Sequence, residues 1–415
     1  MLENPKNNHS DALIIGGGAA GYFAAINIKL NNPECKVTVL EAGQSTLKKV
    51  KISGGGRCNV THHCFEPRRL IESYPRGCRE LLSVFNRFQP QDTVSWFKRF
   101  GVELKIEPDG RMFPETNSSQ TIIDCFQKLT HSLNIQVMLG CRVTRLIRNR
   151  NDFLIKTRNE NEITAKKVLM ATGSDPKTME LIEDLGQPIV SAIPSLFTFK
   201  LPLKGLENLA GQSVSNTTTS LVVGNKKFSS QGPILFTHWG ASGPAILKLS
   251  AFAARELFKS KYQATLRINW LPNESLEQTR CNLNEKRRNL QNKIIYSDPH
   301  PSFSKRLWGY FCARSQIAQD KTWGQLSNKN FNQLLEQLHS FKTEVAGKGV
   351  FKEEFVTAGG VDLKLVDLKN LMSKKVEDLY FAGEILNVDG ITGGFNFQNA
   401  WSTAHIAATH IAAST

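Results

Sequence analysis

Residues Gly16 to Gly21 read Gly-Gly-Gly-Ala-Ala-Gly and match the pattern G-x-G-x-x-G. In this pattern the first glycine permits a tight turn, the second lets the backbone approach a pyrophosphate, and the third lets a helix pack closely on a strand. The N–H groups at the start of that helix attract phosphate. About 20 residues later stands an acidic residue, at the spacing where a carboxylate can accept hydrogen bonds from ribose hydroxyls. The pattern predicts a dinucleotide site that includes Gly16, Gly18, Ala19, Ala20, Gly21 and Glu41.

The elements predicted around this glycine turn have the order that such a site requires. Residues 11–15 form an apolar run that predicts a buried strand, residues 19–30 predict a helix that ends near Asn31, and residues 36–41 predict a second strand. Because glycine clusters are common in turns, the alternative is an α/β unit that binds no nucleotide. The complete order of strand, turn, helix and strand favours the dinucleotide. The charge of Glu41 disfavours the 2′-phosphate of NADP at this position.

A second glycine-rich segment, Ser53-Gly54-Gly55-Gly56-Arg57-Cys58-Asn59, follows the second predicted strand. It holds too many glycines for a stable helix, and its bare backbone suits a flat ring lying against it. The polar groups of Arg57 and Asn59 stand beside these glycines. The alternative interpretation is a flexible surface loop. A classical NAD dehydrogenase would continue with further βαβ units at this point, so the segment favours FAD over NAD.

Three later segments place glycine at the end of a strand or the start of a helix. Ala171-Thr172-Gly173 ends the stretch 135–171, whose alternation predicts a β-meander, and Gly383-Glu384 ends the apolar run that begins at Leu379. Gly393-Gly394-Phe395-Asn396 precedes a helical stretch that reaches about residue 413. A helix that starts there would aim N–H groups at the electron-rich edge of a flavin, which carries negative charge when reduced. Bare backbone near both ends of the chain therefore fits one extended dinucleotide.

The segment Ile52 to Thr61 resembles the signature of a bacterial flavoprotein family that includes aminoacetone oxidase and the BaiN-type and YhiN-type proteins. The resemblance continues over nearly the whole chain, in the segments 110–114, 236–244, 356–361, 381–384 and 393–401. It implies an α/β fold in which a glutathione-reductase-like, Rossmann-type FAD domain is interrupted by an inserted domain.

Carried onto this sequence, the resemblance implies an FAD domain of residues 1–190 and 351–415. It implies an inserted domain of residues 191–350, which is β-rich to about 270 and helical over about 271–340. The ADP moiety is implied at the glycine turn and Glu41, and the flavin ring near Ser53 to Asn59 and Gly393 to Asn396. Further cofactor contacts are implied at Lys49, Val143, Ala171, Thr172, Gly173, Gly383 and Glu384.

The chain departs from the family pattern in three places. After Gly173 the family usually carries a run Thr-Gly-Ser-Thr-Gly-Asp-Gly, which is missing here. Leu365 stands where many members have Glu, and Asn387 stands where many have Asp. These differences leave FAD binding expected and weaken the transfer of any specific activity.

Two residues are predicted to take part in catalysis. His238 could move a substrate proton, because histidine gives or takes a proton near neutral pH, and the alternative is a structural histidine. Arg57 could hold an anionic substrate or the flavin edge, or form a structural ion pair. The predicted function is an FAD-dependent oxidoreductase that passes a hydride between a small organic substrate and the flavin. NAD(P)H or O2 is the expected redox partner.

The bulk composition sets the remaining expectations. The chain has 415 residues with a formal net charge of +15, and it has neither a long apolar run nor a secretory signal, so we expect a cytoplasmic protein without a membrane segment. Its eight cysteines form no C-x-x-C pair, which predicts reduced thiols and no metal site. The excess of Lys and Arg motivates an alternative, a flavoprotein that acts on or with RNA. Because the basic clusters are short, nucleic acid is the less favoured partner. A third alternative is a member that holds FAD without turnover.

Overall fold

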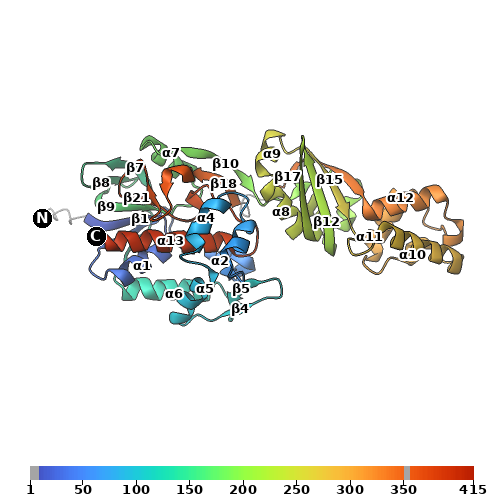
Figure 1. Ribbon diagram of the computed structural model, residues 1–415, viewed down its shortest axis with the longest axis horizontal. Coiled ribbons are helices and arrows are strands. Elements are labelled where there is room, and N and C mark those ends of the chain that lie inside the picture. Colours follow the sequence, from blue (N-terminus) through green and yellow to red (C-terminus); the bar gives the residue numbers. More distant parts are fainter. Residues whose placement is uncertain (1–8, 350–355) are drawn as a thin grey trace. The chain divides into compact units, whose positions relative to one another are not determined.

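The structure is a computed structural model that describes residues 9–349 and 356–415. The chain divides into two compact units, one of Met1–Ala192 with Thr357–Thr415 and one of Ile193–Val356. In Figure 1 the first unit carries the blue, green and red parts of the ribbon, and the second carries the yellow and orange parts. Residues 351–355, which the sequence assigns to the FAD domain, lie outside the described residues. The assignment of these units as FAD domain and insertion stays a prediction.

The first unit is built on a nine-stranded sheet. Its main strand order is β19-β20-β21-β9-β1-β2-β6, and the five strands from β21 to β6 run parallel. Long apolar runs form the parallel strands because both faces of such a sheet are buried. The parallel strands are β1 (His9–Ile15), β2 (Val37–Leu40), β6 (Gln136–Met138), β9 (Glu162–Met170) and β21 (Leu379–Phe381).

The sheet is completed by strands that run antiparallel. β7 (Val143–Arg148) and β8 (Phe153–Thr157) form a meander with β9, and β19 (Val366–Asp367) and β20 (Met372–Ser373) extend the other side. The sequence predicts a meander over all of 135–171, and this is wrong for β6, which pairs with β2 in the parallel part. A small sheet of β3 (Thr61–His62), β4 (Leu104–Ile106) and β5 (Arg111–Pro114) contains a hairpin whose connection includes Asp109-Gly110.

Two helices of the first unit come from opposite ends of the chain and lie side by side. They are α1 (Ala19–Asn31) and α13 (Phe395–Ala413), and their buried residues share one hydrophobic core with the sheet (Figure 1). Their bounds confirm the predicted helices. The other helices of this unit are α2 (Lys48–Gly56), α3 (Pro67–Leu70), α4 (Cys78–Phe85), α5 (Pro90–Arg99), α6 (Gln120–Ser132) and α7 (Pro176–Asp184). Strand β10 (Ile189–Ser195) follows α7 in the chain, and strand β18 (Val356–Val361) follows β17 (Gly347–Lys348). The two strands β10 and β18 pair with each other in a two-stranded sheet.

The second unit contains a seven-stranded sheet and five α-helices among its described residues. The strand order is β16-β15-β12-β13-β14-β11-β17. The strands are β11 (Phe199–Lys200), β12 (Ser213–Val223), β13 (Lys226–Phe236), β14 (Gly240–Ser242), β15 (Ala264–Asn269), β16 (Phe341–Val345) and β17 (Gly347–Lys348). The helices are α8 (Pro244–Phe252), α9 (Ala254–Lys259), α10 (Leu276–Asn289), α11 (Lys305–Arg314) and α12 (Asn328–His339). Helices α8 and α9 are separate because the chain leaves helical geometry at Ala253.

The fold class predicted from the sequence, a Rossmann-type α/β fold, is confirmed. The bounds of helix α2 reach Gly56, but its backbone confirms that the glycine-rich segment is not regular helix. Its last turn is irregular, since Ser53 has an extended ψ of 148° and Gly54 and Gly55 have left-handed backbones. The regular part of α2 thus ends before the glycines begin.

Candidate cofactor-binding site

Four parallel strands of the first unit end at the same level. Their registers pair Ile15 with Leu40 and with Met170, and Met170 with Phe381. The residues that follow these strand ends therefore meet at one edge of the sheet. Ligands of open α/β sheets bind outside the carboxyl ends of the strands. This edge brings together Gly16, Glu41, Ala171, Thr172, Gly173, Gly383 and Glu384.

The glycine turn is packed so closely that side chains would not fit at two of its positions. A Cβ on Gly16 would lie 2.4 Å from the carbonyl oxygen of Ala171, and a Cβ on Gly21 would lie 1.9 Å from the carbonyl oxygen of Gly16. Gly18 differs, because a Cβ there would meet nothing within 4 Å. Gly18 is the N-cap of α1, and no side chain caps that helix start. The free N–H groups of α1, beginning with Ala19 and Ala20, thus border an open space.

Glu41 holds the glycine turn in place. One carboxylate oxygen accepts a hydrogen bond from the N–H of Gly17 at 3.0 Å, and the other accepts one from the N–H of Gly43 at 2.7 Å. The backbone carbonyl of Glu41 accepts from Cys141 at 2.9 Å, which brings the start of β7 and the half-buried Val143 to this end of the sheet. Each carboxylate oxygen keeps acceptor capacity for a ribose hydroxyl.

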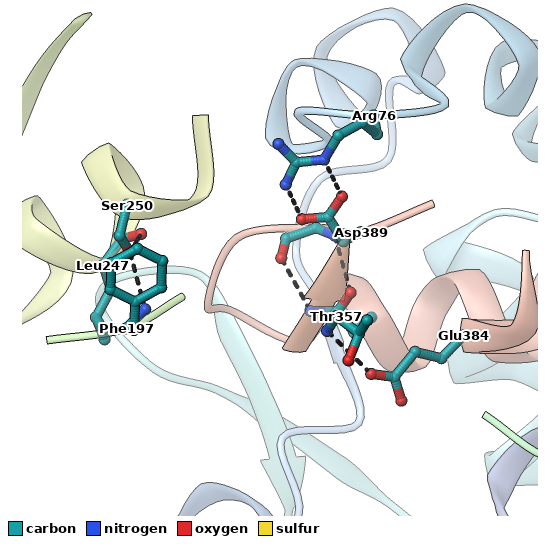
Figure 2. A network of polar contacts seen from close by, with 9 residues as sticks. Arg76, Phe197, Leu247, Ser250, Thr357, Glu384 and Asp389 are labelled. Carbon is teal, nitrogen blue, oxygen red and sulfur yellow. Dashed lines mark hydrogen bonds and ion pairs between the residues drawn. The ribbon is translucent and has the colours of Figure 1, made fainter. Parts of the chain in front are cut away.

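Lys49 and Glu384 form an ion pair across this edge, with 2.5 Å between Nζ and the carboxylate. Glu384 also accepts a hydrogen bond from the N–H of Thr357 at 3.4 Å (Figure 2). A Cβ on Gly173 would come within 3.6 Å of Glu384 and 3.9 Å of Lys49. The neighbouring Thr172 hydroxyl is buried and has no hydrogen-bond partner among the described residues. A buried hydroxyl without a partner at this strand end is free to bond to a ligand.

Arg57 lies at the end of the glycine-rich segment and is held on two sides. Its guanidinium donates to Glu107 at 2.6 Å and lies 4.0 Å above the ring of Phe113. Gly55 and Gly56 face open space, because a Cβ on either would meet nothing within 4 Å. Burial raises the pKa of the neighbouring Cys58 thiol to about 12, so this thiol stays protonated at neutral pH.

The two glycine-rich loops touch directly. With its amide oriented so that both ends are satisfied, Asn59 donates to the carbonyl of Thr61 at 3.0 Å and accepts from the N–H of Gly394 at 2.9 Å. A Cβ on Gly394 would lie 2.5 Å from the Thr61 carbonyl oxygen. The Asn396 side chain donates to the carbonyl of Gly390 and accepts from its N–H, at 3.0 and 2.8 Å. These contacts shape the loop that leads into α13.

Further contacts fix the loop that precedes α13. The buried Phe395 stacks on His62 with 4.7 Å between ring centroids, and its carbonyl accepts from the Tyr74 hydroxyl at 2.7 Å. Asp389 is fully buried and receives two hydrogen bonds from the guanidinium of Arg76 (Figure 2). The start of α13 is therefore held rigidly against the glycine-rich segment.

The model of the HI0933-like protein Rossmann domain matches residues 10–410. The chain belongs to the HI0933-like family. This membership confirms the resemblance seen in the sequence, and it confirms an FAD-dependent oxidoreductase with FAD as the cofactor.

Curated relatives match over nearly their full length. A "Ribosomal RNA dihydrouridine synthase" of Haemophilus influenzae is 29% identical, over 98% of this chain and 99% of the relative. A protein of the same name from Escherichia coli is 29% identical, over 97% and 98%. A "3-dehydro-bile acid delta(4,6)-reductase" of Clostridium scindens is 25% identical, over 95% and 97%.

Solved structures with a similar fold are more distant in sequence. A 3-ketosteroid-delta4-(5alpha)-dehydrogenase from Rhodococcus jostii RHA1 has a TM-score of 0.51 at 12% identity, with 98% of each chain covered. A flavocytochrome c3 fumarate reductase has a TM-score of 0.52 at 15% identity, covering 99% of this chain and 79% of that one. At these identities the likeness shows the fold alone.

The residues of this HI0933-like chain fit FAD. The open space before Gly18 and α1 suits a pyrophosphate, the Thr172 hydroxyl offers an unused polar group, and Gly55 and Gly56 leave room for a flat ring. Bound FAD would supply an acceptor and donor of two electrons. A surface cavity lined by residues such as Glu80, Arg87 and Asp367 contains none of the predicted site residues.

The second predicted catalytic residue lies in the other compact unit. His238 is exposed in the turn between β13 and β14, with 6.4 Å between its ring centroid and that of Trp239. It is not among the residues that meet at the strand ends, and its catalytic role stays a prediction. Among the described residues, no helix has both the length and the apolar character needed to cross a bilayer.

Sequence reasoning missed three residues of the site. No cofactor contact is predicted at His62, whereas the structure stacks it on Phe395 beside the second glycine loop. Arg76 and Asp389 were not singled out, although they form the buried pair beneath that loop. The available signal for Asp389 was an acid directly before a glycine turn. Nothing local to Arg76 indicated a partner so far along the chain.

Proposed function

We propose that this protein is an FAD-dependent reductase that saturates a carbon–carbon double bond conjugated to a carbonyl, and that its substrate is uridine in RNA. Dihydrouridine differs from uridine by saturation of one such bond in the uracil ring. The name of the Clostridium relative describes the reduction of double bonds conjugated to a 3-oxo group. The curated relatives named here thus share one type of chemistry, and their full-length similarity supports it for this chain.

The observation that carries the choice of RNA is the distribution of charge. Residues 193–356 contain 22 Lys and Arg against 11 Asp and Glu, whereas the rest of the chain contains 30 against 26. The second unit therefore carries +11 of the net +15. A steroid-sized substrate with a single carboxylate does not need such a charge, while a polyanion is attracted by it. We place RNA first for this reason, although the shortness of the basic clusters disfavours it at the level of sequence.

The chain's own residues would perform three tasks in this reaction. The glycine turn, Glu41 and the start of α13 would hold the cofactor, and Arg57, fixed by Glu107 and Phe113, would present cationic N–H groups beside the ring. Saturation of the double bond adds one hydride and one proton. NAD(P)H is the proposed source of the two electrons, and His238 is the proposed source of the proton.

The experiment uses the purified FAD-loaded protein under anaerobic conditions. NADH or NADPH should bleach the flavin absorbance, and addition of ribosomal RNA that lacks dihydrouridine should restore it. Mass spectrometry of the digested RNA should then show nucleosides that are heavier by two hydrogens. If NAD(P)H bleaches the flavin and the protein binds RNA, but no dihydrouridine forms, the RNA part of the proposal is wrong.

A second candidate is the reduction of a free unsaturated carbonyl compound. The full-length similarity to the bile acid reductase favours it. It predicts that a conjugated ketone, rather than RNA, restores the colour of the reduced flavin. Bleaching by an amine and recovery with O2 would instead indicate an oxidase, and a flavin that no reductant bleaches would indicate a member without turnover.

A further inference from the structure

The sheet of the second unit has one face covered by helices and one face open. Leu221, Ile234 and Leu266 point to the covered face, where they share a hydrophobic core with Ile246 and Leu249 of α8. Figure 1 shows α8 and α9 beside the strands of this sheet. Because successive side chains of a strand point to opposite faces, the residues between these positions point away from that core. The burial pattern of β12, β13, β15 and β16 alternates accordingly.

The open face of these four strands is crossed by a row of polar side chains. The strand registers pair Ser229 with Ser220, Ser220 with Arg267, and Arg267 with Lys342. Ser229, Arg267 and Lys342 are exposed, and Ser220 is half-buried. Directly paired residues of neighbouring strands lie on the same face, so Arg267 and Lys342 stand next to each other.

The two rows of side chains beside this central row are also mostly polar. One contains Gln231, Thr218 and Asn269, and the other contains Lys227, Val222, Thr265 and Glu344. We call these three rows together the outer face. Glu344 is its only acid, and both of its oxygens accept from the Thr265 hydroxyl, at 3.2 and 3.0 Å. The outer face therefore offers hydroxyls, amides and three cations.

None of these three cations forms an ion pair with a described residue. Like charges that stand directly opposite each other on neighbouring strands destabilise a sheet. Lysine on an edge strand can serve to prevent pairing between sheets, and this could account for Lys342 on the edge strand β16. It does not account for Arg267, because β15 is an interior strand. An anion that bridges the two cations would relieve their repulsion.

We propose that the outer face binds the phosphate backbone of RNA, with Arg267 and Lys342 as its central contacts. This inference rests on the proposed function, because it assigns a binding surface to the proposed RNA substrate. The complementary charge of the second unit, which carries +11 of the net +15, supports a polyanionic partner. The hydroxyl and amide side chains around the cations are the groups that commonly bond to phosphate oxygens.

The composition of the outer face also indicates how RNA would be held. It contains no aromatic side chain on which a base could stack, so it fits contacts to the backbone and not recognition of bases. Binding at this surface should be independent of sequence and strongly weakened by salt. Selection of the uridine would then fall to the cofactor site.

The test measures binding of a fluorescein-labelled single-stranded RNA to the FAD-loaded protein by fluorescence anisotropy, between about 50 and 200 mM salt. The variant is R267Q/K342Q, which keeps polar side chains on an exposed surface. Because each phosphate contact adds about 0.7 to the slope of log K against log salt for single strands, loss of two contacts should reduce the slope by about 1.4. The affinity at low salt should fall at least about tenfold, and the melting temperature should not fall, since a repulsion has been removed.

The matched control is K305Q/K329Q, which removes the same formal charge at two exposed lysines of α11 and α12. It should change the affinity and the salt slope much less. Equal effects of the two double variants would show that the outer face is not the RNA-binding surface, because the affinity would then depend on total charge alone. No RNA binding by the wild type, or binding only to vesicles of anionic lipid, would overturn it as well.

Failure of the surface and failure of the proposed function can be separated. If R267Q/K342Q binds RNA as tightly as the wild type and still forms dihydrouridine, the surface is wrong and the function stands. If the wild type binds RNA through the outer face but never forms dihydrouridine, the surface stands and the function is wrong.

Discussion

The buried carboxylate of Asp389 accepts two hydrogen bonds from the guanidinium of Arg76, which stands 313 positions earlier in the chain. Asp389 is fully buried, and the Arg76 side chain is 14% exposed. The pair fixes the loop that leads to Gly393 and Gly394 and to the start of α13. The stability of the first unit and the shape of the cofactor site are therefore coupled through one ion pair.

Replacement of this carboxylate should destabilise the protein strongly. D389N leaves the buried Arg76 cation without its counter-charge, and breaking a buried pair in this way typically costs about 3–5 kcal/mol. The measurement is urea unfolding of the FAD-loaded protein. The control is E66Q, which breaks the pair between Arg69 and Glu66, whose side chains are 77% and 59% exposed. That change should stay within about 0.5 kcal/mol. Equal losses in the free energy of unfolding would show that the buried pair stabilises the protein no more than the exposed pair does.

Two glycines of the same motif should respond differently to alanine. G21A would place a Cβ 1.9 Å from the carbonyl oxygen of Gly16, so it should destabilise the fold by about 1–3 kcal/mol even without cofactor. G18A meets nothing within 4 Å, so the apoprotein should keep its stability while the protein loses affinity for FAD. Thermal melting of the apoprotein and FAD titration give the two readouts. If G18A binds FAD as the wild type does, the pyrophosphate does not lie against Gly18.

The sequence predicts those parts of the site that depend on local pattern. The glycine turn, both flanking strands and the start of α13 follow from residues that are neighbours in the chain, since a turn or a helix start is set by its own backbone. The contacts between the two glycine loops could not be predicted, because they join Asn59 to Gly394 and His62 to Phe395 across more than 300 residues. The sequence gives the net charge directly. The placement of Arg267 beside Lys342 on one face of the sheet could not be predicted, because it depends on the strand registers.

Cys58 should make the protein less stable at alkaline pH. Its pKa is raised from 9.0 to about 12 by burial, so the folded state keeps the proton between these values while the unfolded state releases it. The contribution of Cys58 to stability is therefore complete below about pH 9 and is lost as the pH rises towards 12. Urea unfolding across this range should show a shallower decline for C58A than for the wild type.

A chemical measurement checks the same shift of the pKa. Iodoacetamide reacts with thiolates, so it should modify the exposed Cys281 at pH 8 while the buried Cys58 stays unmodified in the folded protein. Peptide mapping after brief exposure separates the two. Rapid modification of Cys58 would mean that this segment opens, and the expected pH dependence would then not hold.

His238 should be needed for the transfer of a proton to the substrate and not for reduction of the flavin. If it is the proton donor, H238Q should lower the rate at which substrate reoxidises the reduced flavin by about 10²–10⁴, because general acid catalysis commonly contributes that much. The rate at which NAD(P)H bleaches the flavin should not change, since that step needs no proton from the substrate site. The control is H131Q, which removes an exposed imidazole of α6 that has no predicted catalytic role. Stopped-flow absorbance separates the two half-reactions, and an H238Q protein with both rates intact would show that the proton comes from another group.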